Sequence, residues 1–148
     1  MKWITRERAM VDRIACPWLI SRFVDRNPEF LFVPSGEVNK AAKELGAIPF
    51  DVDGAELNHF QENGKEYVTF DAIMRKYKLA DPVLDQVAAI VRAADAHDPE
   101  NVPEAIGLKA IAVGFRMISR NDYENMAKQF PVYDALYEYC KSKSKASS

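Results

Sequence analysis

The stretch TFDAIMRKY, residues 69–77, marks the point at which the hydrophobic pattern of the chain changes. Its large apolar side chains recur at intervals of three or four residues, at Phe70, Ile73, Met74 and Tyr77. This spacing predicts a helix, with Thr69 as a suitable N-cap. Before it, short β-rich segments follow period two; after it, the pattern is helical. We therefore expect an α+β fold, in which a small sheet from the N-terminal half packs against a mostly helical C-terminal half.

Towards the N-terminus, the chain contains three short segments rich in β-branched and aromatic residues. They comprise residues 2–5, 30–33 and 47–52. A hairpin is expected at residues 59–68, because Asn63 and Gly64 suit a tight turn with positive φ values. Helices are expected between these segments, at about residues 17–25 and 36–45, and Gly46 is a suitable C-cap for the second.

The second half of the chain contains several signals for the start of a helix. They lie at Asp81-Pro82, Pro103, Asn121 and Pro131. Proline is well tolerated in the first turn of a helix, and Asn121 with Glu124 resembles a capping box that opens a short helix. We predict a single domain over residues 1–140, followed by a disordered polar tail over residues 141–148.

The composition is that of an ordinary soluble globular protein. Of the 148 residues, 48% are hydrophobic and 28% are charged, which excludes wholesale disorder and a disulfide scaffold. No apolar run approaches the length of a membrane span, and the N-terminus lacks the apolar segment of a signal peptide. Cys16 and Cys140 lie far apart and do not form a metal-spaced pair. We therefore expect a cytoplasmic protein with reduced cysteines and no membrane partner.

The distribution of charge is more informative than the net charge of −2, which argues against a dedicated nucleic-acid binder. Basic residues outnumber acidic ones in residues 1–26. Residues 49–64 and 94–104 are acidic and contain neither lysine nor arginine. The two histidines, His59 and His97, fall one in each acidic stretch, which makes these stretches the first place to look for chemistry.

A first candidate site is an anion site made by Arg6, Arg8, Arg13 and Cys16. If Pro17 occupies the first helical turn, the backbone N–H groups after it are free to bind an anion. The arginines would then offer guanidinium forks to a tetrahedral oxyanion, and a Cys16 thiolate would be stabilised at the helix end. In the alternative interpretation, Cys16 is a small buried side chain and the arginines form ion pairs with Glu7 and Asp12.

A second candidate site is a metal site with His59 and several carboxylates. The carboxylates are Glu56, Asp12, Asp95 and Glu104. Imidazole and carboxylate groups are ligands of zinc, iron and manganese. We expect the acidic and basic clusters to meet in one mixed polar site, with Glu56 and His59 close to Asp12 and Arg13. The alternative places His59 on an exposed hairpin, and we expect His97 to lie on the solvated surface.

The chain also resembles a known family. The resemblance rests on the segments VDRIACPWLI (residues 11–20), FLFVP (30–34), GAIPFDV (46–52), ELNH (56–59), IVRAAD (90–95), PEAIGL (103–108) and VYDALY (132–137). On these segments the chain is similar to the C-terminal domain of the ChrB-type chromate resistance proteins, over nearly its full length. The resemblance implies a role in resistance to chromate, a tetrahedral dianion. Longer family members are associated with transcriptional control and carry additional sequence before this region.

Two hypotheses of different class follow. In the first, the domain is an oxyanion-responsive binding or regulatory module that takes a small oxyanion such as chromate. In the second, it is a metal-dependent enzyme that acts on a small molecule and holds a divalent metal such as zinc at its histidine and carboxylates. We do not expect this chain alone to bind nucleic acid. A homo-oligomer is compatible with both hypotheses.

Overall fold

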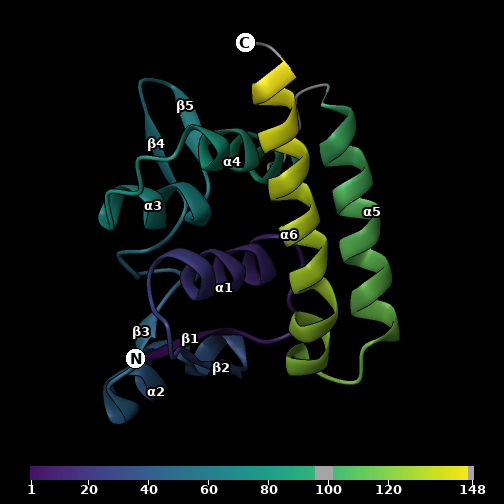
Figure 1. The fold of residues 1–148 in the computed structure, drawn as a ribbon. Coiled ribbons are helices and arrows are strands. Elements are labelled where there is room, and N and C mark those ends of the chain that lie inside the picture. Colours follow the sequence, from purple (N-terminus) through teal and green to yellow (C-terminus); the bar gives the residue numbers. More distant parts are fainter. Residues whose placement is uncertain (96–101, 147–148) are drawn as a thin grey trace.

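The computed structural model of the chain describes residues 1–95 and 102–146. The elements follow in the order β1 (Lys2–Arg6), α1 (Asp12–Phe23), β2 (Glu29–Val33), a 3-10 turn (Ser35–Glu37), α2 (Val38–Leu45), β3 (Ile48–Pro49), β4 (Phe60–Glu62), β5 (Lys65–Tyr67), α3 (Thr69–Lys76), α4 (Pro82–Asp95), α5 (Pro103–Ile118) and α6 (Asp122–Ala146). Within the described ranges, every strand precedes Thr69 and helices follow it (Figure 1). This confirms the predicted α+β class.

β1 is the central strand of a parallel sheet of three strands, in the order β2-β1-β3. Trp3 and Ile4 are both fully buried, and neighbouring residues of a strand point to opposite faces of the sheet. Each of them belongs to a separate apolar cluster. The sheet is therefore covered on both faces, as parallel sheets generally are. Pro49, which has no N–H group, lies in the edge strand β3.

The larger apolar cluster joins the two halves of the chain. It includes the large buried side chains Trp3, Trp18, Phe50, Phe70 and Tyr133. α1 lies at its centre, between the sheet and helices α3 and α4 (Figure 1), and it also packs against α6. The smaller cluster fills the space between the sheet and α2.

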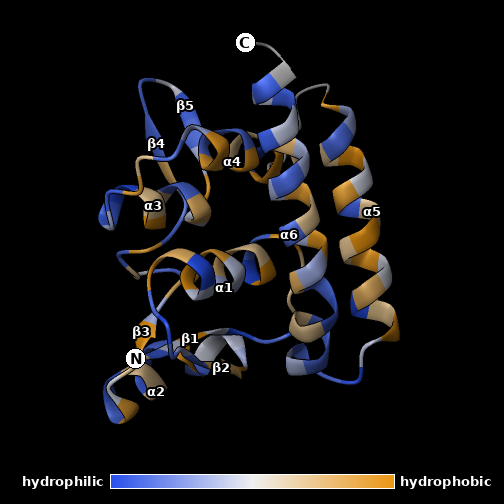
Figure 2. Ribbon diagram, in the orientation of Figure 1, coloured by the Kyte–Doolittle hydropathy of each residue, from blue (hydrophilic) through white to orange (hydrophobic). Residues whose placement is uncertain are grey.

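The helices of the second half form a layer beside this α/β portion. α4, α5 and α6 pack against one another, and the long helices α5 and α6 run side by side (Figure 1). The hairpin of β4 and β5 is mostly hydrophilic, whereas α1 and α4 carry more apolar residues (Figure 2). None of the helices in the described part of the chain combines the length and the apolar character needed to cross a membrane.

Two prolines occupy positions that differ from the sequence prediction. Pro17 was expected in a first helical turn, but it lies inside α1, which already begins at Asp12. Pro131 was expected to begin the last helix, but it lies inside α6. An interior proline removes one backbone hydrogen bond and costs about 3 kcal/mol. At Pro17 this cost is offset by burial, because the side chains around it in α1 are in the core.

Three smaller predictions also need correction. Thr69 is the first residue of α3 and not its N-cap; the cap position is held by Val68, whose N–H donates to the Asp71 carboxylate at 3.0 Å. The strand predicted at residues 47–52 is shorter, at Ile48–Pro49. Residues 141–146, expected in a disordered tail, belong to α6.

Two glycines, one at the end of α2 and one within α5, differ in backbone conformation. Replacing each with alanine should therefore change the free energy of unfolding in opposite directions. Gly46 ends α2 in the left-handed region at φ 65°, whereas Gly107 lies on the exposed side of α5. An added methyl group meets no atom within 4 Å at either position. We expect Gly46→Ala to lower the free energy of unfolding by about 1 kcal/mol and Gly107→Ala to raise it by about 0.5–1 kcal/mol. Urea denaturation measures both changes, and a loss of stability in both variants would contradict this interpretation.

Candidate metal centre

A group of polar side chains lies where the parallel strands end and α1 begins. Arg6 is the last residue of β1, Asp51 follows β3 closely, and Asp12 is the first residue of α1. His59 lies just before β4, and Asp95 is the last residue of α4. In open parallel sheets, ligands bind at the carboxyl ends of the strands. The fold therefore places these five side chains at the edge where a binding site is expected.

The imidazole of His59 is at the centre of this group. Its Nε2 atom is 3.1 Å from Asp95 Oδ2, 3.3 Å from Asp51 Oδ1 and 3.4 Å from Asp12 Oδ2. Its Nδ1 atom is 3.6 Å from Glu66 Oε1. One imidazole nitrogen carries at most one hydrogen, so it can donate a full hydrogen bond to only one of the three oxygens. The centre thus contains more acceptors than the histidine can satisfy.

The carboxylates strongly favour the charged form of His59. Their hydrogen bonds and charges outweigh the effect of burial and raise the pKa of His59 to about 12. Burial, together with the charges of Asp51 and Asp95, raises the pKa of Asp12 above its usual value. Burial would also raise the pKa of Asp51, but hydrogen bonds from His59 and Thr69 reverse the direction and lower it. Without a metal ion, the centre is therefore held together by a protonated imidazole.

Asp12 is oriented by contacts that leave little freedom to its carboxylate. It is buried, with 2% of its side chain exposed. Its Oδ2 atom accepts the backbone N–H of Thr69 at 2.9 Å, and its Oδ1 atom accepts the Cys16 S–H at 3.2 Å. Such contacts behind a ligand fix its orientation and tune its affinity for a metal.

Asp51 connects the centre to two arginines. Its Oδ2 atom lies 3.1 Å from Arg6 Nη2 and 3.4 Å from Arg13 Nε, and its Oδ1 atom accepts the Thr69 hydroxyl hydrogen at 2.7 Å. Arg13 also donates to the carbonyl groups of Arg6 and Glu7. Both guanidinium groups are thus engaged within the protein, and they neutralise part of the negative charge around His59.

The donor set fits a divalent metal ion. Asp12, His59 and Asp95 each offer one ligand atom, and these atoms lie within 4.8 Å of one another. Ligands about 2.1 Å from one ion lie roughly 3.0–3.4 Å from each other, which is the range of the distances from His59 Nε2. Four carboxylates, including Glu66, face two arginines, so the excess negative charge matches one divalent cation beside a neutral imidazole.

Comparison with known proteins gives the family. The sequence model described as "ChrB, C-terminal domain" matches residues 3–140. The chain belongs to the ChrB C-terminal domain family. It is 31% identical over 145 residues to Protein ChrB of Cupriavidus metallidurans, an alignment that covers 97% of this chain. The chain spans 42% of the length of that relative. No solved structure matches the chain.

The structure brings together only part of the residues that the sequence singled out in this ChrB-family domain. His59, Asp12 and Asp95 meet, and Arg6 and Arg13 approach them through Asp51. The other predicted ligands do not join the cluster of described residues. Glu56 is exposed and forms an ion pair with Lys76, at 2.7 Å, and Glu104 lies in the first turn of α5. His97 lies outside the described residues.

The predicted anion site at the helix end does not form as the sequence indicated. Because α1 begins at Asp12, its first turn carries a carboxylate, and Pro17 is not near the helix end. Arg8 lies in a different place, in a cavity beside the junction of α5 and α6. Cys16 is fully buried, and burial raises the pKa of its thiol well above the usual value. Cys16 is therefore a small buried thiol, as in the alternative interpretation, and not a thiolate at a helix end.

Asp51 is the main residue of the centre that the sequence analysis did not name. The signal that could have identified it is topological: charged residues of opposite sign, Arg6 and Asp51, lie at the carboxyl ends of two predicted strands. If both strands are parallel neighbours, these residues must meet at one edge. The sequence pattern alone did not give the direction of the strands.

The burial of both thiols predicts how they react. Cys16 and Cys140 are 0% and 1% exposed, and burial raises the pKa of each thiol. We expect neither to react with a thiol reagent such as dithionitrobenzoate in the native protein, and both to react after denaturation. Rapid stoichiometric labelling of Cys16 in the folded protein would contradict the buried arrangement.

Proposed function

We propose that this ChrB-family domain acts in chromate resistance through a divalent metal ion held by Asp12, His59 and Asp95. The observation that carries the proposal is the convergence of carboxylate oxygens of Asp12 and Asp95, which are far apart in the sequence, on the Nε2 atom of His59. The distances of 3.1–3.4 Å lie at or beyond the upper end of the hydrogen-bond range of about 2.7–3.2 Å, and they also suit neighbouring ligands of one ion.

The accessibility of the centre supports a metal that meets a small molecule. The side chains of His59 and Asp95 are 31% and 19% exposed, whereas Asp12 is buried. Sites with three protein ligands and an open position are typical of reactive metal centres, whereas structural zinc sites are closed by four protein ligands. The proposal is therefore a metal-dependent function on a small molecule, and Arg6 and Arg13 lie close enough to contribute positive charge beside it.

Metal binding of the purified chain tests the proposal. The protein is treated with a chelator, dialysed, and titrated with Zn²⁺, Mn²⁺ or Fe²⁺ under anaerobic conditions. We expect one equivalent of ion by elemental analysis, and a gain of about 2.7 kcal/mol in the free energy of unfolding at a free concentration a hundredfold above Kd. Enhanced water-proton relaxation of the Mn²⁺ form would show an exchangeable ligand. Absence of stoichiometric binding for all three ions would overturn the proposal.

A second candidate function is an oxyanion-responsive module. Arg8 favours it, because its guanidinium group lines a cavity and forms no ion pair with a carboxylate of the described residues. Arg6 and Arg13 are less suited to this task, because both are held by Asp51. Chromate would then be recognised as a tetrahedral dianion, away from the metal centre.

A further inference from the structure

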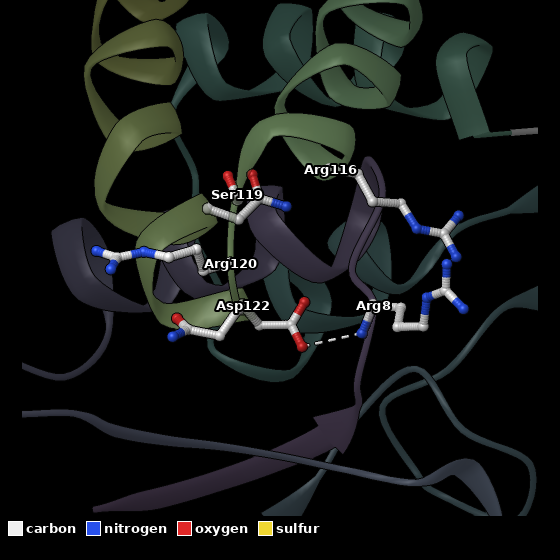
Figure 3. A pocket seen from close by; sticks show the side chains of 7 residues that line it. Arg8, Arg116, Ser119, Arg120 and Asp122 are labelled. Atoms are coloured by element: carbon white, nitrogen blue, oxygen red, sulfur yellow. Dashed lines mark hydrogen bonds between the residues drawn. The ribbon is translucent and has the colours of Figure 1, made fainter.

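A small polar cavity lies between the loop after β1 and the junction of α5 and α6. It has a volume of about 210 Å³, and it is lined by Arg8, Arg116, Ser119, Arg120, Asn121, Asp122 and Asn125 (Figure 3). None of these residues belongs to the cluster around His59. The cavity is therefore a separate feature of the fold, formed by residues more than a hundred positions apart in the sequence.

Two arginines in this cavity have no acidic partner. Figure 3 shows the guanidinium groups of Arg8 and Arg116 directed toward each other, and neither forms an ion pair with a described residue. Arg120, the third arginine, forms an ion pair with Glu124 at 2.8 Å and points away from the other two (Figure 3). Like charges that face each other are unfavourable unless an anion lies between them.

Asp122, the acidic residue of the cavity, accepts hydrogen bonds from backbone N–H groups. Both carboxylate oxygens of Asp122 accept backbone N–H groups, from Arg8 at 2.9 Å and from Ala9 at 2.7 Å. These bonds hold Arg8 at a φ of 63°, a conformation that is uncommon for residues other than glycine. Asp122 thus fixes the backbone that presents the Arg8 side chain, and it does not neutralise the guanidinium group.

The lining of this cavity includes buried polar atoms that lack a hydrogen-bond partner. Among the described residues, three buried side-chain atoms lack a hydrogen-bond partner: Arg116 Nε, Ser119 Oγ and Gln129 Oε1. Two of the three belong to residues that line this cavity. A buried polar atom left without a partner costs about 1–3 kcal/mol. The unpaired N–H of Arg116 is a donor that an anion bound between the two guanidinium groups would satisfy.

We propose that this cavity binds a small tetrahedral oxyanion through the guanidinium groups of Arg8 and Arg116. Guanidinium groups bind oxyanions with two parallel hydrogen bonds, which makes them suited to sulfate-like ions. The volume of about 210 Å³ leaves room for an ion of five heavy atoms. The inference rests on the second candidate function above, for which it names the recognising groups.

Calorimetric titration of the full chain with inorganic sulfate tests the inference, at an ionic strength of about 0.1 M, where long-range charge effects are screened beyond about 10 Å. We expect one sulfate per chain. Arg116→Gln and Arg8→Gln should each weaken binding at least tenfold. Arg120→Gln is the matched control, because it removes a positive charge from the same cavity. Since Arg120 forms an ion pair with Glu124, the sulfate affinity of this variant should change less than threefold. Circular dichroism shows whether each variant is folded; Arg8 is exposed, so its variant should fold even if that of Arg116 does not.

Further titrations separate this inference from the metal centre and identify the anion. Sulfate binding should persist in His59→Ala, and metal binding should persist in Arg116→Gln, so each site can fail alone. Titrations with phosphate and chromate show which of these ions of the same shape binds with the highest affinity. No stoichiometric binding of any of the three anions, or an equal loss in Arg120→Gln and Arg116→Gln, would overturn the inference. Binding of a short DNA duplex without binding of free anions would also overturn it.

Discussion

His59→Ala is expected to abolish stoichiometric metal binding, with a loss in affinity of at least about 100-fold. The imidazole is the only nitrogen ligand in the cluster of Asp12, His59 and Asp95. Changes to groups that merely support a metal ligand already cost 10–100-fold in affinity, so the removal of a ligand should cost more. Elemental analysis after dialysis and direct titration with Zn²⁺ or Mn²⁺ measure the effect.

The matched control is Glu56→Gln. The sequence placed Glu56 three positions before His59 as a candidate ligand, but its carboxylate is 72% exposed and binds Lys76. We expect the metal affinity of this variant to stay within twofold of that of the original chain. A full equivalent of metal in His59→Ala, or loss of metal in Glu56→Gln, would show that the ion binds elsewhere. His59→Gln, which keeps a hydrogen-bond donor among the three carboxylates, tests whether a failure of His59→Ala comes from folding.

The parts of the fold that depend on local sequence were predictable. The change to helical spacing near Thr69 located the boundary between strands and helices, and Gly46 correctly marked the end of α2. The predicted positions of the two interior prolines within their helices were wrong for the same physical reason. A local rule assigns Pro17 and Pro131 to the first turn of a helix, but both helices continue through the proline because residues on either side of it are buried. Such burial is not visible in a window of a few residues.

The site was predictable only where charge alone could identify it. A basic cluster near residue 12 and an acidic stretch around residue 59 indicated that Asp12 and His59 would meet, and they do. The choice between Glu56 and Asp51 as the companion of His59 could not be made from spacing. It depends on β1 and β3 being parallel neighbours, which brings Asp51 to Arg6, whereas Glu56 forms an ion pair with Lys76.

Asp51→Asn is expected to lower the free energy of unfolding by about 3 kcal/mol, at the low end of the range for breaking a buried ion pair. Asp51 is 5% exposed and Arg13 is 15% exposed, so the substitution leaves a largely buried guanidinium group without its carboxylate. Arg6, at 38% exposed, can turn to solvent and should contribute less. Relief of the repulsion between Asp51 and Asp12 offsets part of the loss, which is why we place the value at the low end. Urea denaturation of the metal-free protein measures the change.

Asparagine is the informative replacement because it removes the charge of Asp51 and keeps the backbone conformation. Asp51 has a φ of 54°, in the left-handed region that asparagine adopts more readily than most residues. Its side-chain oxygen can still accept the Thr69 hydroxyl hydrogen, which Asp51 accepts at 2.7 Å. Glu62→Gln serves as the control, since Glu62 and its partner Arg75 are both 48% exposed and exposed pairs contribute about 0–1 kcal/mol. Similar losses in the two variants would mean that the centre is as well solvated as the surface. That result would contradict the assignment of Asp51 and Arg13 as a buried ion pair.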